Sequence, residues 1–271
     1  MARMKLSKKF RKAFPFFWPN RLPNFFIAGA ARCGTTSMWQ YLRQHPDIHM
    51  PPVFELKEPS FYCELYGMRD RIDYLSLFDN AGSKKMVGEA SGPYLTSPDS
   101  PARIHAEIPD ARFIIMLRNP AERAFSKFKW MRENGYETCE TFEEALRAEV
   151  ETRKDNAWFM KNNGQYYHNF LYFNSGLYAE QVKRFHDAFG KDRVLVIIFE
   201  EFAKNTLHWV RQAYSFLGVD PSFTPHLEIH NPTSGKTRFD PALRAELMAK
   251  YAPSIIQLEV LLQRELRSLW D

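Results

Sequence analysis

A short stretch near the amino terminus combines the residue types that bind phosphate. Residues 25–37 read Phe-Phe-Ile-Ala-Gly-Ala-Ala-Arg-Cys-Gly-Thr-Thr-Ser. This order predicts a buried strand, a turn bounded by Gly29 and Gly34, and the start of a helix. Glycines let backbone N–H groups approach phosphate oxygens closely, and the first turn of a helix adds unpaired donors and the positive end of its dipole. The stretch therefore predicts a loop that binds a phosphate-bearing ligand.

One position in this loop departs from the common P-loop pattern. The spacing from Gly29 to Gly34 matches G-x-x-x-x-G-K-[ST], but Thr35 stands where the lysine is expected. The positive side chain is instead Arg32, inside the loop. We therefore expect the loop to bind a phosphate-bearing ligand, but without the lysine that grips β- and γ-phosphates in a P-loop. An ordinary strand-to-helix turn in another α/β fold is the alternative.

A second phosphate-binding pattern follows the apolar run 111–117, which predicts a buried strand. Arg118 ends this strand, and Ser126 follows eight residues later on the next helix, after Arg123. A guanidinium at a strand end and a hydroxyl on the following helix can hold two oxygens of one phosphate. A P-loop hydrolase has an aspartate at such a strand end to hold Mg²⁺. The sequence therefore predicts phosphate binding by cations and hydroxyls, without a metal.

Two further segments carry charge near the predicted site. Lys57-Glu58 lies in the loop after the first helix, near the carboxyl ends of the strands, where open α/β sheets bind ligands. Gly235-Lys236-Thr237-Arg238 is a basic loop that can close over an anion. The pairs His45/His49 and His226/His230 have metal-ligand spacing, but prolines interrupt or bracket them and no carboxylate or cysteine partners them. We expect no metal site.

The order of apolar runs and amphipathic segments predicts the fold class. Strands alternate with helices along the 271 residues, which predicts an α/β fold with a central parallel sheet flanked by helices. The length suits one large domain better than two small ones. We assign residues 24–271 to a single domain and residues 1–23 to a leader.

The leader is basic and aromatic. It contains no acidic residue, and no stretch of the chain reaches the roughly 18–20 apolar residues needed to span a bilayer. Two interpretations stand: peripheral contact with an anionic membrane through residues 1–23, or a solvated leader packed on the domain. Its charged and aromatic residues are Arg3, Lys5, Lys8, Lys9, Phe10, Arg11, Lys12, Phe14, Phe16, Phe17, Trp18 and Arg21.

Composition narrows the partners and the compartment. A net charge of +5 and a pI near 9.0 suit an anionic ligand. The three cysteines, Cys33, Cys63 and Cys139, are odd in number and lack paired spacing, so they predict free thiols in a reducing compartment. We expect a cytoplasmic protein, with membrane association through the leader as the alternative, and no nucleic-acid partner. Cys33 is interpreted as a packing residue rather than a nucleophile.

Taken together, these motifs resemble those of sulfotransferases that use 3′-phosphoadenosine 5′-phosphosulfate (PAPS). The loop at 29–37 resembles the 5′-phosphosulfate loop of that family, and Leu-Arg-Asn-Pro at 117–120 with Ser126 resembles its 3′-phosphate motif. The match continues in family order to about residue 240. It is most similar to the heparan sulfate glucosaminyl 3-O-sulfotransferases and their bacterial relatives. The resemblance implies a P-loop-like sulfotransferase fold, PAPS as donor, 3′,5′-adenosine bisphosphate (PAP) as product, and a hydroxyl-bearing acceptor.

The resemblance also implies a role for each matching residue. Glu58 would deprotonate the acceptor hydroxyl, with Lys57 beside it, and Arg32 would stabilise the leaving phosphate oxygen. The alternative for Glu58 is a surface carboxylate that only pairs with Lys57, and Glu55 is the second candidate base. The remaining donor-binding residues would be Cys33, Gly34, Thr35, Thr36 and Ser37 at the 5′ end and Arg118, Ser126, Tyr178, Lys236, Thr237 and Arg238 at the 3′ end.

Two departures from the family pattern bear on the acceptor and the donor loop. Arg32 replaces the usual lysine, which keeps the charge but changes its reach. Ala90 follows Glu89 where the glycan branch has a lysine, so the acceptor can be a sugar, a lipid or a small molecule. Two rival functions also stay open: a nucleotide or small-molecule kinase, and a basic, membrane-associated binding protein without activity.

Overall fold

The computed structural model describes residues 21–51, 57–63, 70–153, 165, 167–228 and 238–270. Most of the predicted leader (residues 1–20), Glu55 and the predicted basic-loop residues Lys236 and Thr237 lie outside these ranges.

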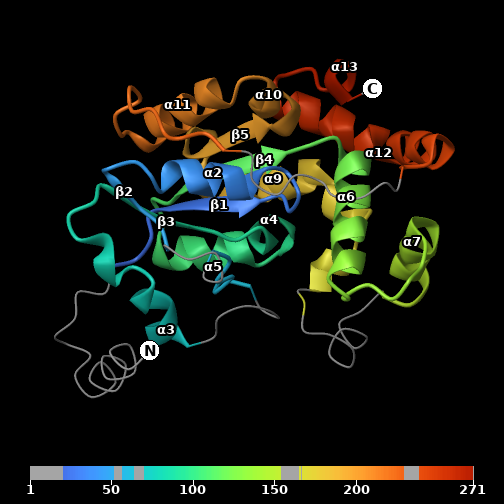
Figure 1. Cartoon of the computed structure of the whole chain (residues 1–271), viewed down its shortest axis with the longest axis horizontal. Coiled ribbons are helices and arrows are strands. Elements are labelled where there is room, and N and C mark those ends of the chain that lie inside the picture. Colours follow the sequence, from blue (N-terminus) through green and yellow to red (C-terminus); the bar gives the residue numbers. More distant parts are fainter. Residues whose placement is uncertain are drawn as a thin grey trace.

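A five-stranded sheet forms the centre of the molecule (Figure 1). All its strand pairs are parallel and the order is β2-β3-β1-β4-β5, which confirms the predicted parallel sheet. The strands are β1 (Phe25–Gly29), β2 (Ile48–His49), β3 (Met86–Ala90), β4 (Arg112–Leu117) and β5 (Val194–Ile198).

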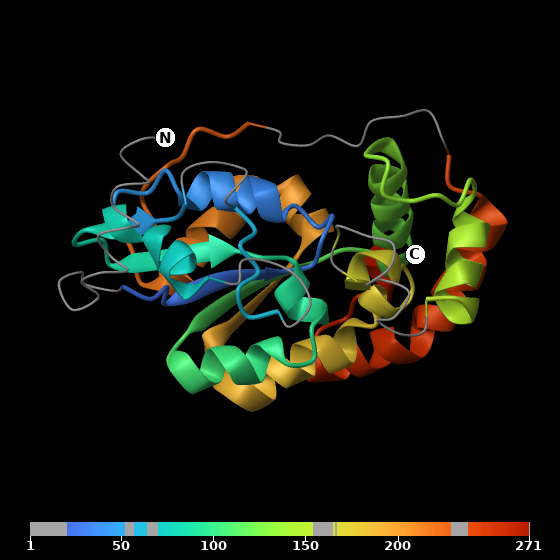
Figure 2. The same cartoon turned by 90° about the horizontal axis from the view of Figure 1, so that it is seen from below.

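Helices cover both faces of the sheet. Helices α2 and α11 lie on one face, and α4, α5, α9 and α12 lie on the other (Figures 1 and 2). The α-helices are α2 (Thr35–Leu42), α3 (Arg71–Ser76), α4 (Pro93–Thr96), α5 (Ser100–Glu107), α6 (Pro120–Glu133), α7 (Phe142–Glu151), α9 (Tyr178–Phe189), α10 (Phe199–Lys204), α11 (Thr206–Leu217), α12 (Pro241–Leu262) and α13 (Arg267–Trp270). Single turns of 3₁₀ helix are η3 (Asp79–Ala81), η4 (Tyr167–Phe170), η5 (Asn174–Gly176) and η6 (Lys191–Arg193).

Helix starts follow their local sequence signals. The Asn119 side chain accepts hydrogen bonds from the backbone N–H groups of Ala121 and Glu122, and Pro120 fixes the first turn of α6. Asp70 caps α3 in the same way, by accepting from two N–H groups of its first turn. These caps set where α6 begins, which in turn fixes the position of Ser126 relative to the end of β4.

Two elements have bounds that the local sequence pattern does not reveal. Ile48–His49 pairs with Met86 and Val87 as an edge strand too short to show any periodicity. Helix α12 ends at Leu262, and its C-cap Gln263 has φ +53°. The Glu259 carboxylate then accepts the N–H groups of Leu266 and Arg267, which orders the turn into α13.

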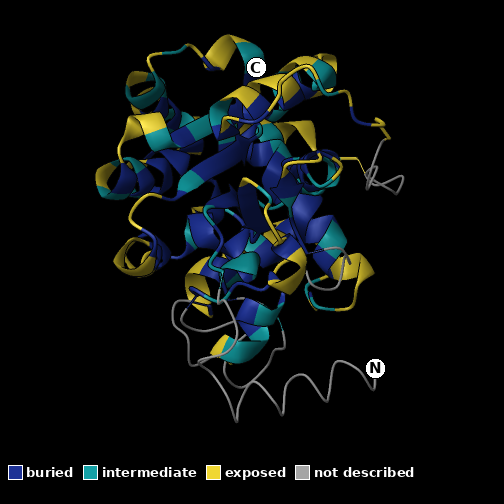
Figure 3. Cartoon of the chain, turned by 90° about the vertical axis from the view of Figure 1, so that its left-hand side faces the viewer, coloured by how far each residue is buried: buried dark blue, intermediate teal, exposed yellow. Residues whose placement is uncertain are grey.

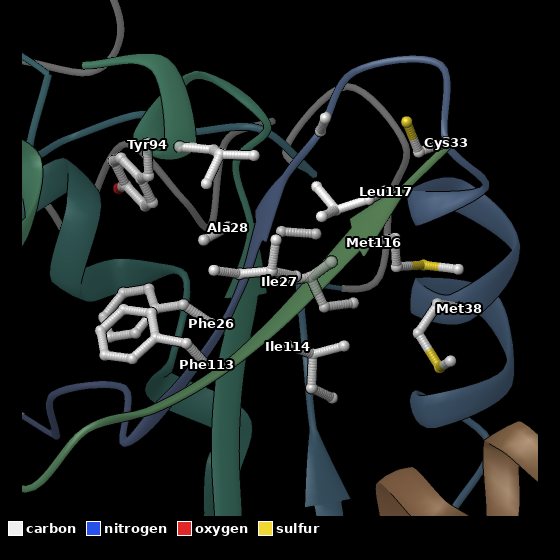
Figure 4. Packing of buried hydrophobic residues seen from close by; sticks show 14 of the residues in the cluster. Phe26, Ile27, Ala28, Cys33, Met38, Tyr94, Phe113, Ile114, Met116 and Leu117 are labelled. Atoms are coloured by element: carbon white, nitrogen blue, oxygen red, sulfur yellow. The ribbon is translucent and has the colours of Figure 1, made fainter. Parts of the chain in front are cut away.

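The core is built on the two central strands. Every residue of β1 is buried, and its Phe26 ring stacks on Phe113 of β4, with centroids 5.4 Å apart. Figure 4 shows these rings on one side of the sheet and Met38 and Met116 on the other. Buried residues concentrate in the interior, along the strands (Figure 3). The continuous burial explains why these strands lack the polar alternation of a half-exposed sheet.

The connections after β1 and β4 diverge. The chain leaving β1 passes through α2 toward β2 and β3, whereas the chain leaving β4 leads through α6 toward β5 on the opposite edge. In open α/β sheets a crevice for ligands forms at such a switch point, beyond the carboxyl ends of the strands. The fold therefore places the loop at 30–34 and the residues at 118–119 side by side.

The described helices and the cysteines bear on membrane spanning and disulfide bonding. Among the described helices, none is long and apolar enough to cross a bilayer. All three cysteines lie in the described ranges and all are free, as predicted.

Replacing Phe113 tests the packing of the central strands. The Phe113 ring is fully buried and also contacts Phe185 and Phe189, so Phe113→Ala should lower the free energy of unfolding by about 3–5 kcal/mol. Urea denaturation measures this change. The control is Val150→Ala at a 65% exposed position, which should change stability by no more than about 0.5 kcal/mol. Equal effects of the two substitutions would contradict the described core.

Candidate functional site

Two glycines shape the loop between β1 and α2. Gly29 has φ +133°, and a Cβ there would lie 2.8 Å from the carbonyl oxygen of Gly92 and 2.9 Å from the Cβ of Leu95. Gly34 has φ +84° and would place a Cβ 3.0 Å from the Phe199 ring. Both positions therefore need glycine, one for close packing and the other mainly for its left-handed backbone.

The start of α2 leaves backbone donors available. Its N-cap is Gly34, so no side chain accepts a hydrogen bond from the first turn. The N–H groups of Thr35, Thr36 and Ser37 therefore lack the cap that most helices have, and the helix dipole adds positive potential there. Thr35 is buried, whereas Thr36 and Ser37 are half-buried and can present their hydroxyls to a ligand.

Cys33 is a packing residue of the loop. Its side chain is fully buried, and burial raises the pKa of the thiol to about 12. A thiol with that pKa is neutral at physiological pH and is a poor nucleophile. This agrees with the interpretation from sequence, and leaves the Cys33 backbone as its only means of contacting a ligand.

Arg32 and the residues predicted to bind a 3′-phosphate come together in space. Arg32 has φ +69°, in the left-handed region that residues other than glycine rarely adopt. Its Nε donates a hydrogen bond to Oγ of Ser126, 3.2 Å away on α6. Burial, and then the nearby positive charge of Arg118, lower the pKa of the Arg32 guanidinium. The structure thus brings together three residues from the two predicted phosphate-binding motifs.

The two guanidinium groups have no ion-pair partner among the residues that the structure describes. Arg118 lies 5.1 Å from the centroid of the Phe199 ring, the same ring that packs against Gly34. Within the described ranges, neither Arg32 nor Arg118 forms an ion pair. Cations held together in this way repel one another and favour an anionic ligand between them.

Lys57 and Glu58 form an ion pair, as the alternative interpretation of Glu58 as a paired surface carboxylate predicts. Lys57 Nζ lies 2.7 Å from Glu58 Oε1; the lysine side chain is 3% exposed and the glutamate side chain 47% exposed. The buried lysine therefore holds an accessible carboxylate in place. That carboxylate is also close enough to raise the proton affinity of Lys127 on α6, so it faces the cation cluster. The ion pair and a role at the site are compatible.

A buried carboxyl group anchors the segment that carries Glu58. Glu89 of β3 is fully buried and accepts hydrogen bonds from the hydroxyls of Tyr74, Tyr94 and Ser91. Ser91 Oγ in turn accepts the backbone N–H of Ser60 at 3.0 Å, two residues after Glu58. Burial raises the pKa of Glu89 to about 7 despite these hydrogen bonds. Its signal in the sequence is a charged residue inside an otherwise apolar strand.

Lys127 is a cation of this site that the sequence analysis missed. It is buried on α6, one residue after Ser126, with Nζ 4.7 Å from the Trp130 ring centroid. Arg123 lies one turn earlier on the same face. Like charges spaced i, i+4 on a helix are normally unfavourable, and that spacing is the signal that was available in the sequence.

The other residues assigned to the 3′-phosphate end are less directly placed. Tyr178 is 1% exposed, its hydroxyl is buried beside Cys33, and burial raises its pKa strongly, so a direct contact with phosphate remains a prediction. Lys236 and Thr237 lie outside the described residues. Arg238 is exposed, and the adjacent Phe239 stacks on Phe125 of α6 with centroids 4.6 Å apart. That stacking holds Arg238 near the helix that carries Ser126.

The histidine pairs are not part of a metal-binding cluster in the described ranges. No group of three His, Cys, Asp or Glu side chains there is arranged to hold a metal ion. The ring nitrogens of His45 contact the carbonyl of Asp220 and the N–H of Asp47, while His49 contacts the carbonyl of Leu77. These two histidines therefore have structural roles.

Comparison with protein families and solved structures gives a consistent match. The family described as "Sulfotransferase domain" matches residues 22–251. A crystal structure of a sulfotransferase from Alicyclobacillus acidocaldarius superposes with a TM-score of 0.79 and 39% sequence identity, covering 92% of this chain and 99% of that one.

Curated relatives are more distant. Carbohydrate sulfotransferase 15 of Mus musculus is 25% identical over an alignment of 287 residues, covering 79% of this chain and 50% of the relative. Human heparan sulfate glucosamine 3-O-sulfotransferase 6 is 32% identical over 108 residues, covering 40% of this chain and 30% of the relative. The chain thus spans about half the length of the first relative.

Glu89 gives the site a predictable dependence on pH. Its pKa of about 7 lies above the ordinary 4.5, so the folded protein holds this proton more tightly than the unfolded chain does. The carboxyl therefore destabilises the fold progressively as pH rises from about 4.5 to 7. Glu89→Gln removes that effect, so relative to wild type its free energy of unfolding should increase by up to roughly 3 kcal/mol between about pH 5 and pH 8.

Chemical denaturation of both proteins at the two pH values measures this difference. The control is Val150→Ala at an exposed position of α7; it changes no titratable group, so its difference from wild type should not change with pH. A Glu89→Gln difference that is the same at both pH values would show that Glu89 has no raised pKa.

Proposed function

The chain belongs to the sulfotransferase domain family, and from that premise we propose that it transfers a sulfuryl group from PAPS to an acceptor hydroxyl. The observation that carries the proposal is the contact of Arg32 with Ser126, beside Arg118 and the uncapped start of α2. These groups offer positive charge and hydrogen-bond donors to an anion.

The residues present suit a nucleotide with phosphates at two ends. The glycine-bounded loop and the amides of Thr35, Thr36 and Ser37 would bind the 5′ end. Arg118 and Ser126 would bind the 3′ phosphate, joined by Lys236, Thr237 and Arg238. Arg32 lies between the two sets, because its Nε already reaches Ser126 from the loop.

The bonds that form and break, and the proton that moves, define what each residue would do. The donor supplies the sulfuryl group; a bond forms between the acceptor oxygen and sulfur while the bond from sulfur to the 5′-phosphate oxygen breaks. The acceptor proton goes to the Glu58 carboxylate, which the buried Lys57 orients. Arg32 and the α2 amides stabilise the negative charge that develops on the departing phosphate oxygen.

The acceptor is proposed only as a hydroxyl-bearing molecule. Carbohydrate sulfotransferase 15 and heparan sulfate glucosamine 3-O-sulfotransferase 6 are named for sugar acceptors, which favours a glycan. Ala90 argues against a heparan-type sugar, so a lipid or small molecule stays in the proposal. The cytoplasmic location and the membrane contact through residues 1–23 also stay predictions; one relative is a membrane-associated sulfotransferase of Dictyostelium discoideum.

Nucleotide-dependent thermal stability separates sulfotransfer from the kinase alternative. PAP without Mg²⁺ should raise the melting temperature, by an increment that grows with concentration as expected for a ligand bound to the folded state. Stabilisation by Mg-ATP alone, with no effect of PAP, would instead support a kinase. Arg118→Ala should reduce the shift with PAP, because it removes a cation that the described residues leave without an ion pair.

Substitution of the proposed base tests the chemical step. Glu58→Gln should lower the rate of sulfate transfer by about 10²- to 10⁴-fold while leaving PAP affinity within about threefold of wild type, because a general base acts on the acceptor. Transfer of ³⁵S-labelled sulfate to a mixed acceptor extract measures the rate. The control is Glu180→Gln, an exposed carboxylate on α9. Full activity of Glu58→Gln would assign the base to another group.

A further inference from the structure

Lys127 occupies a position that a purely structural lysine rarely takes. Its side chain is buried, and its ammonium group lies over the Trp130 ring. Within the described ranges no carboxylate forms an ion pair with it. Buried lysines are uncommon unless they are paired, so this arrangement calls for a partner of negative charge.

The surroundings of Lys127 belong to the donor loop. Together with Ala30, Ala31, Arg123 and His168 it lines a cavity of about 10 Å³, which has room for one water-sized group. The cavity adjoins the backbone just before Arg32. The lysine therefore faces the same loop that is proposed to bind the 5′ end of the donor.

Charged groups from three elements act on the ammonium. Arg32 from the donor loop, Arg123 from its own helix and Lys57 from the segment at 57–63 disfavour its charge, and Glu58 from that same segment favours it. Burial is the largest influence, and the pKa of Lys127 falls to about 7. At pH 8 most Lys127 side chains are therefore neutral before a ligand binds.

We propose that Lys127 is a further donor-binding cation, which becomes protonated when the nucleotide binds and then contacts its phosphosulfate end. The proposal rests on the proposed function, since it takes that nucleotide as the ligand. A polyanion beside Lys127 reverses the local potential that Arg32, Arg123 and Lys57 create, so its proton affinity rises on binding. Binding then consumes a proton from the solvent.

Proton uptake can be measured without any acceptor or turnover. Titration calorimetry of PAP at pH 8, in Tris and in HEPES, gives the number of protons from the dependence of the heat on the ionisation enthalpy of the buffer. The phosphates of PAP are already ionised at this pH, so they take up no proton. Wild type should take up roughly 0.5–1 proton for each nucleotide bound.

Three variants assign that proton. Lys127→Met should abolish the uptake and weaken PAP binding by about tenfold or more, through loss of a charge-assisted hydrogen bond. Lys127→Arg keeps a permanent charge, so binding should persist without uptake. Lys129→Met is the matched control: it lies two residues further on, is similarly buried and sits over Phe125, so uptake and affinity should both remain at wild-type values.

The outcomes separate this proposal from the function on which it rests. If PAP binds and the proton is taken up equally by wild type, Lys127→Met and Lys127→Arg, another group titrates and the proposal is wrong. If wild type binds PAP without proton uptake, the proposal is also wrong while the donor assignment stands. If neither wild type nor any variant binds PAP, the proposed function itself fails.

Discussion

The site depends on holding several positive groups close together, and none of them forms an ion pair within the part of the chain that the structure describes. Arg32 and Arg118 lie close to each other beside Ser126, and Lys127 adds a third cation from α6, the helix that carries Ser126. Their mutual repulsion and desolvation oppose folding, as the lowered pKa values of Arg32 and Lys127 indicate. The surrounding structure must therefore fix these groups through contacts that do not neutralise them.

The apolar sheet provides that rigidity. Phe26 and Phe113 join the two strands whose ends carry the cations, and Gly29 packs so tightly on Gly92 that the loop has little room to shift. On the other side, Glu89 holds Ser91, and Ser91 holds the backbone that leads back to Glu58. The acidic and basic parts of the site are thus fastened to neighbouring strands of one sheet.

Local sequence patterns were enough to predict the parallel sheet and the glycine-bounded loop between β1 and α2, because both depend on residues that are close in sequence or at the ends of apolar runs. The joint binding of one phosphate by Arg118 and Ser126 stays a prediction. Lys127 and Glu89 were not identified as site residues, because their environments arise only when α6 and β3 pack beside the loop and the 57–63 segment. For Tyr178, similarity to a family predicts a phosphate contact that stays a prediction, and its hydroxyl is buried in this structure.

The glycine N-cap of α2 links the stability of that helix to the binding of an anion. A serine or aspartate N-cap typically stabilises a helix by about 0.5–2 kcal/mol because it accepts hydrogen bonds from the first amides, and it would compete with a bound anion for them. The left-handed backbone of Gly34 and the adjacent Phe199 ring disfavour such a side chain in α2. Because α2 has no side-chain cap, a bound anion would accept the hydrogen bonds of its first amides in place of that cap. Secondary structure and occupancy are therefore coupled, and this turn of α2 should exchange its amide hydrogens faster than the rest of the helix until an anion covers it.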